Sequence, residues 1–297
     1  MIGALAALAS SFTWSAGSAV YAQLSREYLP SQVNFSRALV ALPLFVWSAL
    51  LFDGAQSGEV WSRLLSGNGL WLLISMVASY GLGDMAFFWS VRSLGLPGAL
   101  AIASSYPFWS AAAGVLFEGQ SLSTIKILGV VCTVLGTVIV VLMGYRHRQR
   151  VISDIFDRFE VGLALGFTTS LFWALNTFAV SRGAQGLSPH VANSVRMISA
   201  LAICPLVGLA LQRKWRTGIP WRSFKPVSWV FALEAYGGSF FFVYGLSHTS
   251  LAVASALSSL SPVIAVPMAW VGKHEPVSWV KALGVCVAVL GAVLLVI

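Results

Sequence analysis

Apolar residues follow one another along most of this chain in stretches of about 20 positions, and short polar segments separate them. A helix needs about 20 predominantly apolar residues to cross the hydrocarbon core of a bilayer. Stretches of this kind predict ten spanning helices, at 2–23, 33–52, 69–91, 98–117, 125–143, 161–182, 190–211, 227–247, 251–271 and 278–297. The pattern therefore predicts an all-α integral membrane protein.

The chain is a duplicated unit, because sets of residues return at a nearly constant spacing. One set is repeated 159 positions later: Trp14, Pro30, Asn34 and Arg37, then Trp173, Pro189, Asn193 and Arg196. A second set is repeated 155 positions later: Pro107, Ser123, Lys126, Gly129 and Gly136, then Pro262, Ser278, Lys281, Gly284 and Gly291. One loop of different length in each half explains the small change in spacing.

Duplication divides the chain into a first repeat at 2–143, a polar linker at 144–160 and a second repeat at 161–297. Because each repeat holds an odd number of predicted helices, the second repeat enters the membrane from the opposite side. The ten helices are thus expected to form two inverted five-helix repeats around a central cavity. Inverted repeats are typical of secondary transporters, which bind substrate near mid-membrane where the repeats meet.

Composition excludes a water-soluble protein, because 58% of the residues are hydrophobic and only 9% are charged. Soluble domains carry about 25% charged residues. The net charge of +8 comes mainly from two short basic segments, 146–150 and 213–225. Basic loops of membrane proteins set orientation and contact anionic lipid headgroups. We therefore expect a lipid bilayer, and no nucleic acid, as the partner of these charges.

The distribution of basic residues also predicts an orientation. Of the 18 lysines and arginines, 14 lie at helix ends that face the loops after odd-numbered helices. The positive-inside rule places those loops in the cytoplasm and both termini outside.

Two carboxylates interrupt the apolar stretches, Asp84 in the third predicted helix and Glu234 in the eighth. They are not equivalent in the repeat, since Asp84 aligns with Ser239 and Ser79 with Glu234. A carboxylate at membrane depth is costly and usually faces a cavity or a partner, and burial favours its neutral form. The two residues are candidates for proton coupling or for recognition of a substrate amine. The alternative is a protonated carboxyl bonded to a neighbouring helix.

Small residues are dense at 99–105 and at 252–259, and each run leads to a proline, Pro107 or Pro262. Small residues allow helices in lipid to pack closely, which is the simpler interpretation. Proline removes an intrahelical hydrogen bond and kinks a helix. Two kinked helices at equivalent places predict a cavity wall, with Ser258 as a candidate lining residue.

Arg37 and Arg196 lie near the starts of the second and seventh predicted helices, each three residues after an asparagine. This spacing places the amide and the guanidinium on one helix face. Snorkelling to the lipid headgroups is the favoured interpretation, and a gating role on each side of the membrane is the alternative.

Several aromatic residues lie deep in the predicted helices beside polar neighbours such as Asn176. They are Trp14, Tyr80, Tyr106, Trp173 and Tyr236. Binding sites favour aromatic walls with a few polar anchors, so these residues are candidates for a pocket that holds a flat or amphipathic solute. Simple packing is the alternative for each residue alone.

These features together resemble the drug/metabolite transporter superfamily, specifically its ten-helix members built from two EamA-type repeats. Each copy has a small-residue helix that reaches a proline, then an acidic residue, then a closing helix with spaced glycines. The segments are 101–107, Glu118 and 126–136 in the first copy, and 256–262, Glu275 and 281–291 in the second. The Trp14 and Trp173 helices and the two arginines also fit. One departure is that Glu118 aligns with Lys273, so a shared role of the two acidic residues is not implied.

The resemblance implies a central cavity lined by helices 1, 3, 4, 6, 8 and 9, and alternating access by rocking of helix pairs. Members move small metabolites such as amino acids and nucleosides, commonly outward. Many relatives place both termini in the cytoplasm, opposite to the orientation that the basic residues predict.

The sequence thus predicts a secondary active transporter of a small organic metabolite, such as an amino acid, in a prokaryotic cytoplasmic membrane. Export is the expected direction, and protons are the candidate coupling ion. The chain is expected to act as a monomer or homodimer, without a cofactor or metal and without enzymatic activity. A lipid-linked-sugar flippase and an integral-membrane transferase are the alternatives. A transferase needs a constellation of His, Cys or carboxylate groups, and the four histidines are scattered over different loops.

Overall fold

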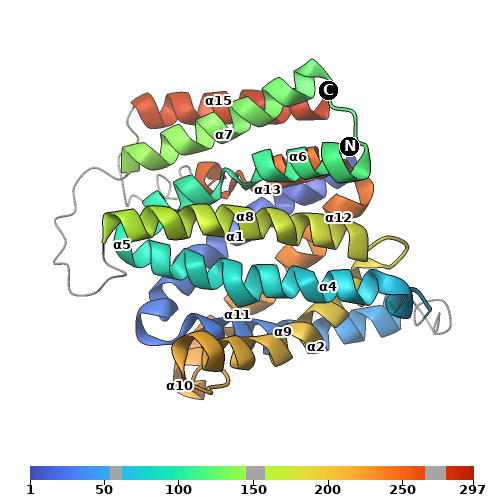
Figure 1. Cartoon of the computed structure of the whole chain (residues 1–297), viewed down its shortest axis with the longest axis vertical. Helices are drawn as coiled ribbons and strands as arrows, with labels where there is room; N and C mark the ends of the chain where they lie inside the picture. Colours follow the sequence, from blue (N-terminus) through green and yellow to red (C-terminus); the bar gives the residue numbers. More distant parts are fainter. Residues whose placement is uncertain (54–61, 145–157, 265–278) are drawn as a thin grey trace.

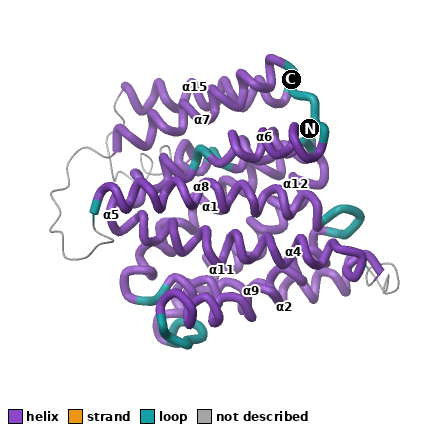
Figure 2. The backbone as a smooth tube through the Cα atoms, in the orientation of Figure 1, coloured by secondary structure: helices purple, strands orange, loops and turns teal. Residues whose placement is uncertain are grey.

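The computed structural model describes residues 1–53, 62–144, 158–264 and 279–297, and helices account for nearly all of them. In the first half the elements are α1 (Ile2–Glu27), α2 (Pro30–Phe52), η1 (Leu64–Asn68), α4 (Gly69–Met76), η2 (Val77–Gly83), α5 (Asp84–Ala103), α6 (Tyr106–Glu118) and α7 (Thr124–Gly144). In the second half they are α8 (Phe159–Gly183), α9 (Pro189–Gln212), α10 (Trp221–Phe224), η4 (Lys225–Val227), α11 (Ser228–Phe231), η5 (Ala232–Gly238), α12 (Ser239–His248), α13 (Leu251–Ser258) and α15 (Trp279–Val296). The long helices lie side by side along one common direction (Figure 1), with the loops of the described residues at their ends (Figure 2).

Within the described ranges, five helices are long and apolar enough to cross a membrane. They are Pro30–Phe52, Leu64–Leu94, Phe159–Gly183, Pro189–Leu211 and Trp221–His248, and shorter apolar helices cover Thr124–Ile139, Leu251–Ile264 and Ala282–Leu295. Each stretch predicted from the sequence contains helix where it is described. Residues 265–271 of the ninth stretch and most of the 144–160 linker lie outside the described residues. The crossing of the membrane ten times stays a prediction.

The polarity of α2 is reversed relative to a helix of a soluble protein. Trp47 and Leu50 are 63% and 68% exposed, whereas Asn34 and Arg37 are buried. Large apolar side chains also face outward on many other helices. Such a surface suits lipid, and ionisable groups in membrane proteins face the bundle interior. The long apolar helices and this reversed polarity indicate a membrane protein.

Equivalent helices of the two halves pack against each other in opposite directions, as α7 and α15 show at one edge of the bundle (Figure 1). A Cβ atom added at Gly136 of α7 would overlap the backbone nitrogen of Ala288 on α15. A Cβ atom added at Gly291 of α15 would overlap the backbone nitrogen of Thr133 on α7. The two contacts are equivalent in the repeat, because Gly291 corresponds to Gly136, and Thr133 corresponds to Ala288, at the 155-residue offset. Because the earlier residue of α7 meets the later residue of α15, the two helices run antiparallel.

The pair α2 and α9 repeats this arrangement at the opposite edge of the bundle (Figure 1). At the end of α2, the Phe52 ring lies 5.7 Å from the ring of His190 at the start of α9. At the start of α2, Ser31 lies against Gly208 near the end of α9. The two halves therefore exchange places under an approximate two-fold symmetry, and equivalent helices point in opposite directions. We call this relation the two-fold exchange.

Two irregularities interrupt the helices at equivalent places. The π-helical segments η2 and η5 begin and end 155 positions apart, and π-helical turns are frequent at functional sites. The next helix of each half breaks at 104–105 and at 259–260, just before Pro107 and Pro262. Each proline stands in the first turn of the segment that follows the break, where its missing N–H leaves no intrahelical hydrogen bond unmade.

Candidate functional site

A cavity of about 120 Å³ lies where the two halves meet, and both π-helical segments and both helix breaks contribute to its wall. Ten of the residues predicted from the sequence line it: Trp14, Arg37, Tyr80, Asp84, Tyr106, Trp173, Asn176, Arg196, Glu234 and Ser258. Three further lining residues, Leu100, Ser104 and Ser259, belong to the two small-residue runs that predict a cavity wall. Residues that sequence reasoning missed complete the lining: Ser10, Ser79, Thr177, Gly238, Ser239, Phe242 and Ser261. Small and hydroxylated residues carry little signal by themselves, so only their nearness to the breaks and π-helical segments could have identified them.

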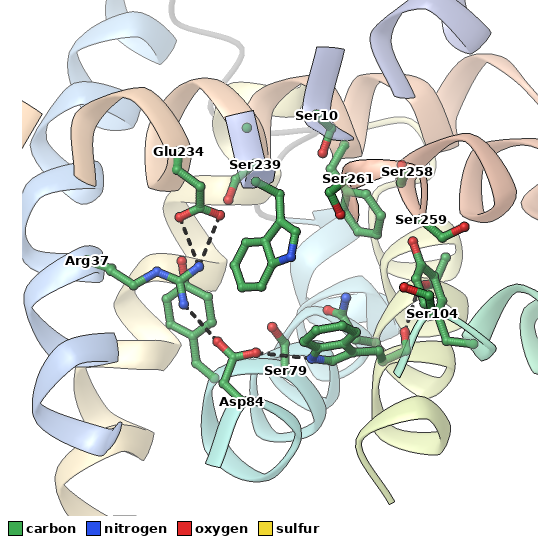
Figure 3. A pocket seen from close by; sticks show the side chains of 18 of the residues that line it. Ser10, Arg37, Ser79, Asp84, Ser104, Glu234, Ser239, Ser258, Ser259 and Ser261 are labelled. Carbon is green, nitrogen blue, oxygen red and sulfur yellow. Dashed lines mark hydrogen bonds and ion pairs between the residues drawn. The ribbon is translucent and has the colours of Figure 1, made fainter. Parts of the chain in front are cut away.

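Arg37 holds both carboxylates of the predicted site. Its Nη1 atom lies 2.7 Å from Asp84 Oδ2, and its Nη2 atom lies 3.0 and 3.1 Å from the two carboxylate oxygens of Glu234. Figure 3 shows Asp84 and Glu234 converging on the guanidinium. Asn34, three residues earlier on α2, accepts a further hydrogen bond from Nη1 at 2.8 Å. Two acidic residues that are not equivalent in the repeat therefore share one cation.

Snorkelling is the wrong interpretation for Arg37, which is only 2% exposed within the protein. The segment before α10 covers the first turns of α2. Gln32 donates a hydrogen bond to the carbonyl of Gly218 at 2.7 Å, and the N–H of Ile219 donates to Ser36 Oγ at 2.9 Å. A guanidinium that is covered in this way requires partners inside the protein.

Aromatic side chains enclose this charge cluster. The Tyr21 hydroxyl donates to Glu234 at 2.5 Å, and Trp173 Nε1 donates to Asp84 at 3.1 Å. The guanidinium carbon of Arg37 lies 4.4 and 4.3 Å from the ring centres of Tyr21 and Tyr80, within the range of cation–π attraction. Sequence reasoning missed Tyr21. Its position seven residues after Trp14, on the same face of α1, is the signal that could have found it.

Arg196 is buried among neutral partners. It donates to Asn193 at 2.8 Å, to Asn176 at 3.2 Å and to Ser75 at 3.1 Å. Only 3% of the residue is exposed, so snorkelling is wrong here as well. Within the described part of the chain, no carboxylate lies within ion-pair distance of this guanidinium.

The prediction that Tyr236 lines the cavity is also wrong. Its hydroxyl is hydrogen-bonded to Ser48 Oγ at 2.6 Å, and its ring packs on Phe45 with centroids 4.6 Å apart. The cavity residues Glu234 and Gly238 stand two positions to either side of Tyr236 in η5. Residues two positions apart on a helix do not share a face, so the Tyr236 side chain points toward α2.

Trp14 and Trp173, which are equivalent in the repeat, lie together where the two halves meet. These equivalent residues contact each other edge to face, with ring centroids 5.7 Å apart at 89°. Tyr106, at the break between α5 and α6, makes a similar contact with Trp173 at 6.1 Å. The cavity therefore combines an aromatic wall with the polar groups of the helix breaks.

Glu118 lies outside the cavity. It accepts hydrogen bonds from Ser181 at 2.7 Å and from Gln120 at 2.6 Å, and its Oε1 atom lies 3.6 Å from Nε of Arg182. These contacts join the end of α6 to the end of α8. Glu275 lies outside the described residues. Among the residues that the structure describes, no group of three His, Cys, Asp or Glu side chains could hold a metal ion.

Apolar helices around a polar interior, with a cavity between two equivalent halves, define a helical membrane protein built to enclose a solute. The chain belongs to the EamA-like transporter family, whose model matches residues 1–142 and 160–297. The resemblance inferred from the sequence is confirmed, and the chain is a membrane transport protein. Family membership favours a transporter over the transferase alternative.

An uncharacterized transporter of Archaeoglobus fulgidus is 28% identical over 131 residues, which are 43% of this chain and 44% of that protein. The match thus spans less than half of that relative. A protein of known crystal structure is similar to 98% of this chain and 95% of its own chain, with a TM-score of 0.74 and 15% sequence identity. At that identity, the likeness shows the fold alone.

Proposed function

We propose that the protein is a secondary active transporter that moves a small organic metabolite by alternating access, and that it crosses the membrane ten times as two inverted five-helix repeats. The observation that carries this proposal is the position of the cavity. It lies between two halves whose equivalent helices run antiparallel, and transporters with inverted repeats bind substrate at that interface. Rocking of one half against the other then exposes the same site to each side in turn.

The charge cluster at Arg37 supplies a means of coupling that movement to protons. Arg37 and Asp84 belong to the first half and Glu234 to the second, so the ion pair at 3.0 Å between Arg37 and Glu234 crosses between the halves. Protonation of Glu234 removes one of the two ionic links of Arg37, while Asp84 keeps the cation paired. The contact between the halves weakens at that moment, which favours their movement.

The aromatic wall and the hydroxyl groups of the cavity support an amphipathic solute of the size of an amino acid. We therefore favour export of a small metabolite from a prokaryotic cell, by a monomer or a homodimer in the cytoplasmic membrane, over a flippase.

Flux into proteoliposomes under an imposed pH gradient tests the proposal. A panel of labelled amino acids should include a solute whose flux follows the gradient. Asp84→Asn and Glu234→Gln should each keep the shape of the cavity but remove the response to the gradient. Glu160→Gln, which changes an exposed carboxyl at the start of α8, is the matched control and should behave as wild type. If no solute of the panel moves, transport of this class is wrong. Proton coupling through these residues is wrong if flux ignores the gradient and survives both substitutions.

A further inference from the structure

The surroundings of Arg196 differ from those of Arg37 at two positions that the repeat relates. With the 155-residue offset, Ser239 stands where Asp84 stands in the first half, and Ser79 stands where Glu234 stands in the second. Both serines line the cavity, as Figure 3 shows. In the sequence repeat, serines therefore take the two places that carboxylates hold in the surroundings of Arg37, and they line the same cavity as Arg196.

Both serines lie close to the groups that hold Arg196. Asn193, which accepts a hydrogen bond from Arg196, donates its own to the backbone carbonyl of Ser239 at 3.1 Å. Ser75, which accepts from Nε of Arg196 at 3.1 Å, precedes Ser79 by about one helical turn. The positions that could supply a counter-ion are thus occupied, but by uncharged side chains.

A buried arginine remains charged, because a guanidinium does not lose its proton in proteins. Burial of a charge without a counter-ion is costly. Asp84 and Glu234 remove that cost for Arg37. Arg196 has only neutral hydrogen-bond partners among the described residues, and no carboxylate lies within ion-pair distance of it. An anion that enters the cavity would complete the site.

We infer that Arg196, Asn176, Ser79 and Ser239 form a subsite for the carboxylate of the transported solute. This inference rests on the proposed function and names its substrate class, small solutes that carry one carboxylate. Arginine matches the planar geometry of a carboxylate with two parallel hydrogen bonds. The pseudo-symmetry also points to a carboxylate, because that group occupies the equivalent places around Arg37.

The balance of charge favours a single negative charge on the solute. When one carboxyl of the Arg37 cluster carries the coupling proton, the lining holds two cations, Arg37 and Arg196, and one anion. A monocarboxylate makes this set neutral, whereas a phosphate dianion leaves an excess negative charge.

Binding of matched acids and amides to the purified protein in lipid nanodiscs tests the subsite. The probes are leucine, phenylalanine, isovalerate and phenylacetate, each compared with its carboxamide. The fluorescence of Trp14 and Trp173, which line the cavity, reports binding. At least one acid should bind about tenfold more tightly than its amide, because the amide cannot neutralise Arg196.

Two pairs of variants separate recognition from folding. Arg196→Gln should reduce the preference for the acid to about onefold, whereas Arg182→Gln, at an arginine outside the cavity that contacts Glu118, should keep it. Ser239→Asp gives Arg196 an internal carboxylate, as Asp84 does for Arg37. It should abolish binding of the acid and raise the unfolding temperature, a combination that misfolding cannot produce. Ser239→Asn has the same shape without the charge, and it should retain binding of the acid.

Equal binding of acid and amide by the wild type would overturn the subsite, as would an unchanged preference in Arg196→Gln. Equal effects of Ser239→Asp and Ser239→Asn would also overturn it, because they would assign the effect to shape. The proposed function fails separately: acids that bind but do not cross proteoliposomes leave the subsite standing without transport. Acids and amides that cross equally well leave transport standing without the subsite.

Discussion

Arg37 and Arg196 occupy the same place in the repeated unit, and their uncharged surroundings are alike. Each guanidinium donates to the asparagine three residues earlier at 2.8 Å. Each asparagine in turn donates to a backbone carbonyl, that of Tyr80 in one half and, in the other, that of Ser239, about one turn beyond the residue equivalent to Tyr80. The charged surroundings differ, because only Arg37 has carboxylates.

The two arginine sites share the means that holds the guanidinium in place, but they differ in how its charge is neutralised. The asparagine next to each arginine holds both guanidinium groups inside the bundle. The unequal carboxylates give each arginine a separate electrostatic role. One site carries its own counter-ions and joins the halves, while the other is left with a charge that a solute can neutralise.

The largest expected effect is that of Arg37→Gln, because it leaves Asp84 and Glu234 buried without their cation. Removal of one partner of a buried ion pair costs about 3–5 kcal/mol. Arg196→Gln should cost much less, since it removes a charge that has no protein counter-ion among the described residues. Unfolding of both variants in detergent micelles measures the difference. The triple variant with Asp84→Asn and Glu234→Gln should recover part of the stability lost by Arg37→Gln. An equal loss in Arg196→Gln would contradict the contrast between the sites.

A smaller effect is expected where the two halves are alike, at the crossing of α7 and α15. Gly136→Ala and Gly291→Ala should each lower the free energy of unfolding by about 1–3 kcal/mol, the usual cost of overpacking. The two losses should be similar, because each new Cβ atom meets backbone of the other helix. Gly237→Ala, with nothing within 4 Å of the added atom, is the matched control. Unequal losses at Gly136 and Gly291 would show that the two-fold exchange does not extend to this edge.

The smallest effect concerns the equivalent tryptophans. Trp14→Phe and Trp173→Phe remove the same side-chain volume, but only the second removes a hydrogen bond to Asp84. Hydrogen bonds inside membrane proteins contribute about 0.6 kcal/mol on average and up to about 1.7. Trp173→Phe should be the less stable variant by an amount in that range, measured by unfolding of both variants side by side. A larger loss in Trp14→Phe would contradict the asymmetry of the cluster.

Local chemistry made much of this protein predictable from its sequence. The lengths of apolar stretches predict most of the helices within a few residues, because burial in lipid requires an unbroken apolar run. The exception is α5, which continues through 92–97, where the sequence pattern predicts a connection between two helices. The breaks before Pro107 and Pro262 follow from the missing proline N–H. The position of Arg37 was misjudged, because the coverage of α2 by residues 218–219 depends on a loop about 180 positions away.

The amino-acid sequence by itself determined the membrane class and the duplication, since these depend on composition and spacing. The opposite direction of the two halves is a prediction from the odd number of expected helices in each repeat. Only the tertiary structure decided that Asp84 and Glu234 share Arg37, that Tyr21 holds Glu234, and that Tyr236 points away from the cavity. Such pairings join residues up to 213 positions apart, and no local pattern encodes them. They arise when antiparallel packing of the halves brings unequal side chains to equivalent places.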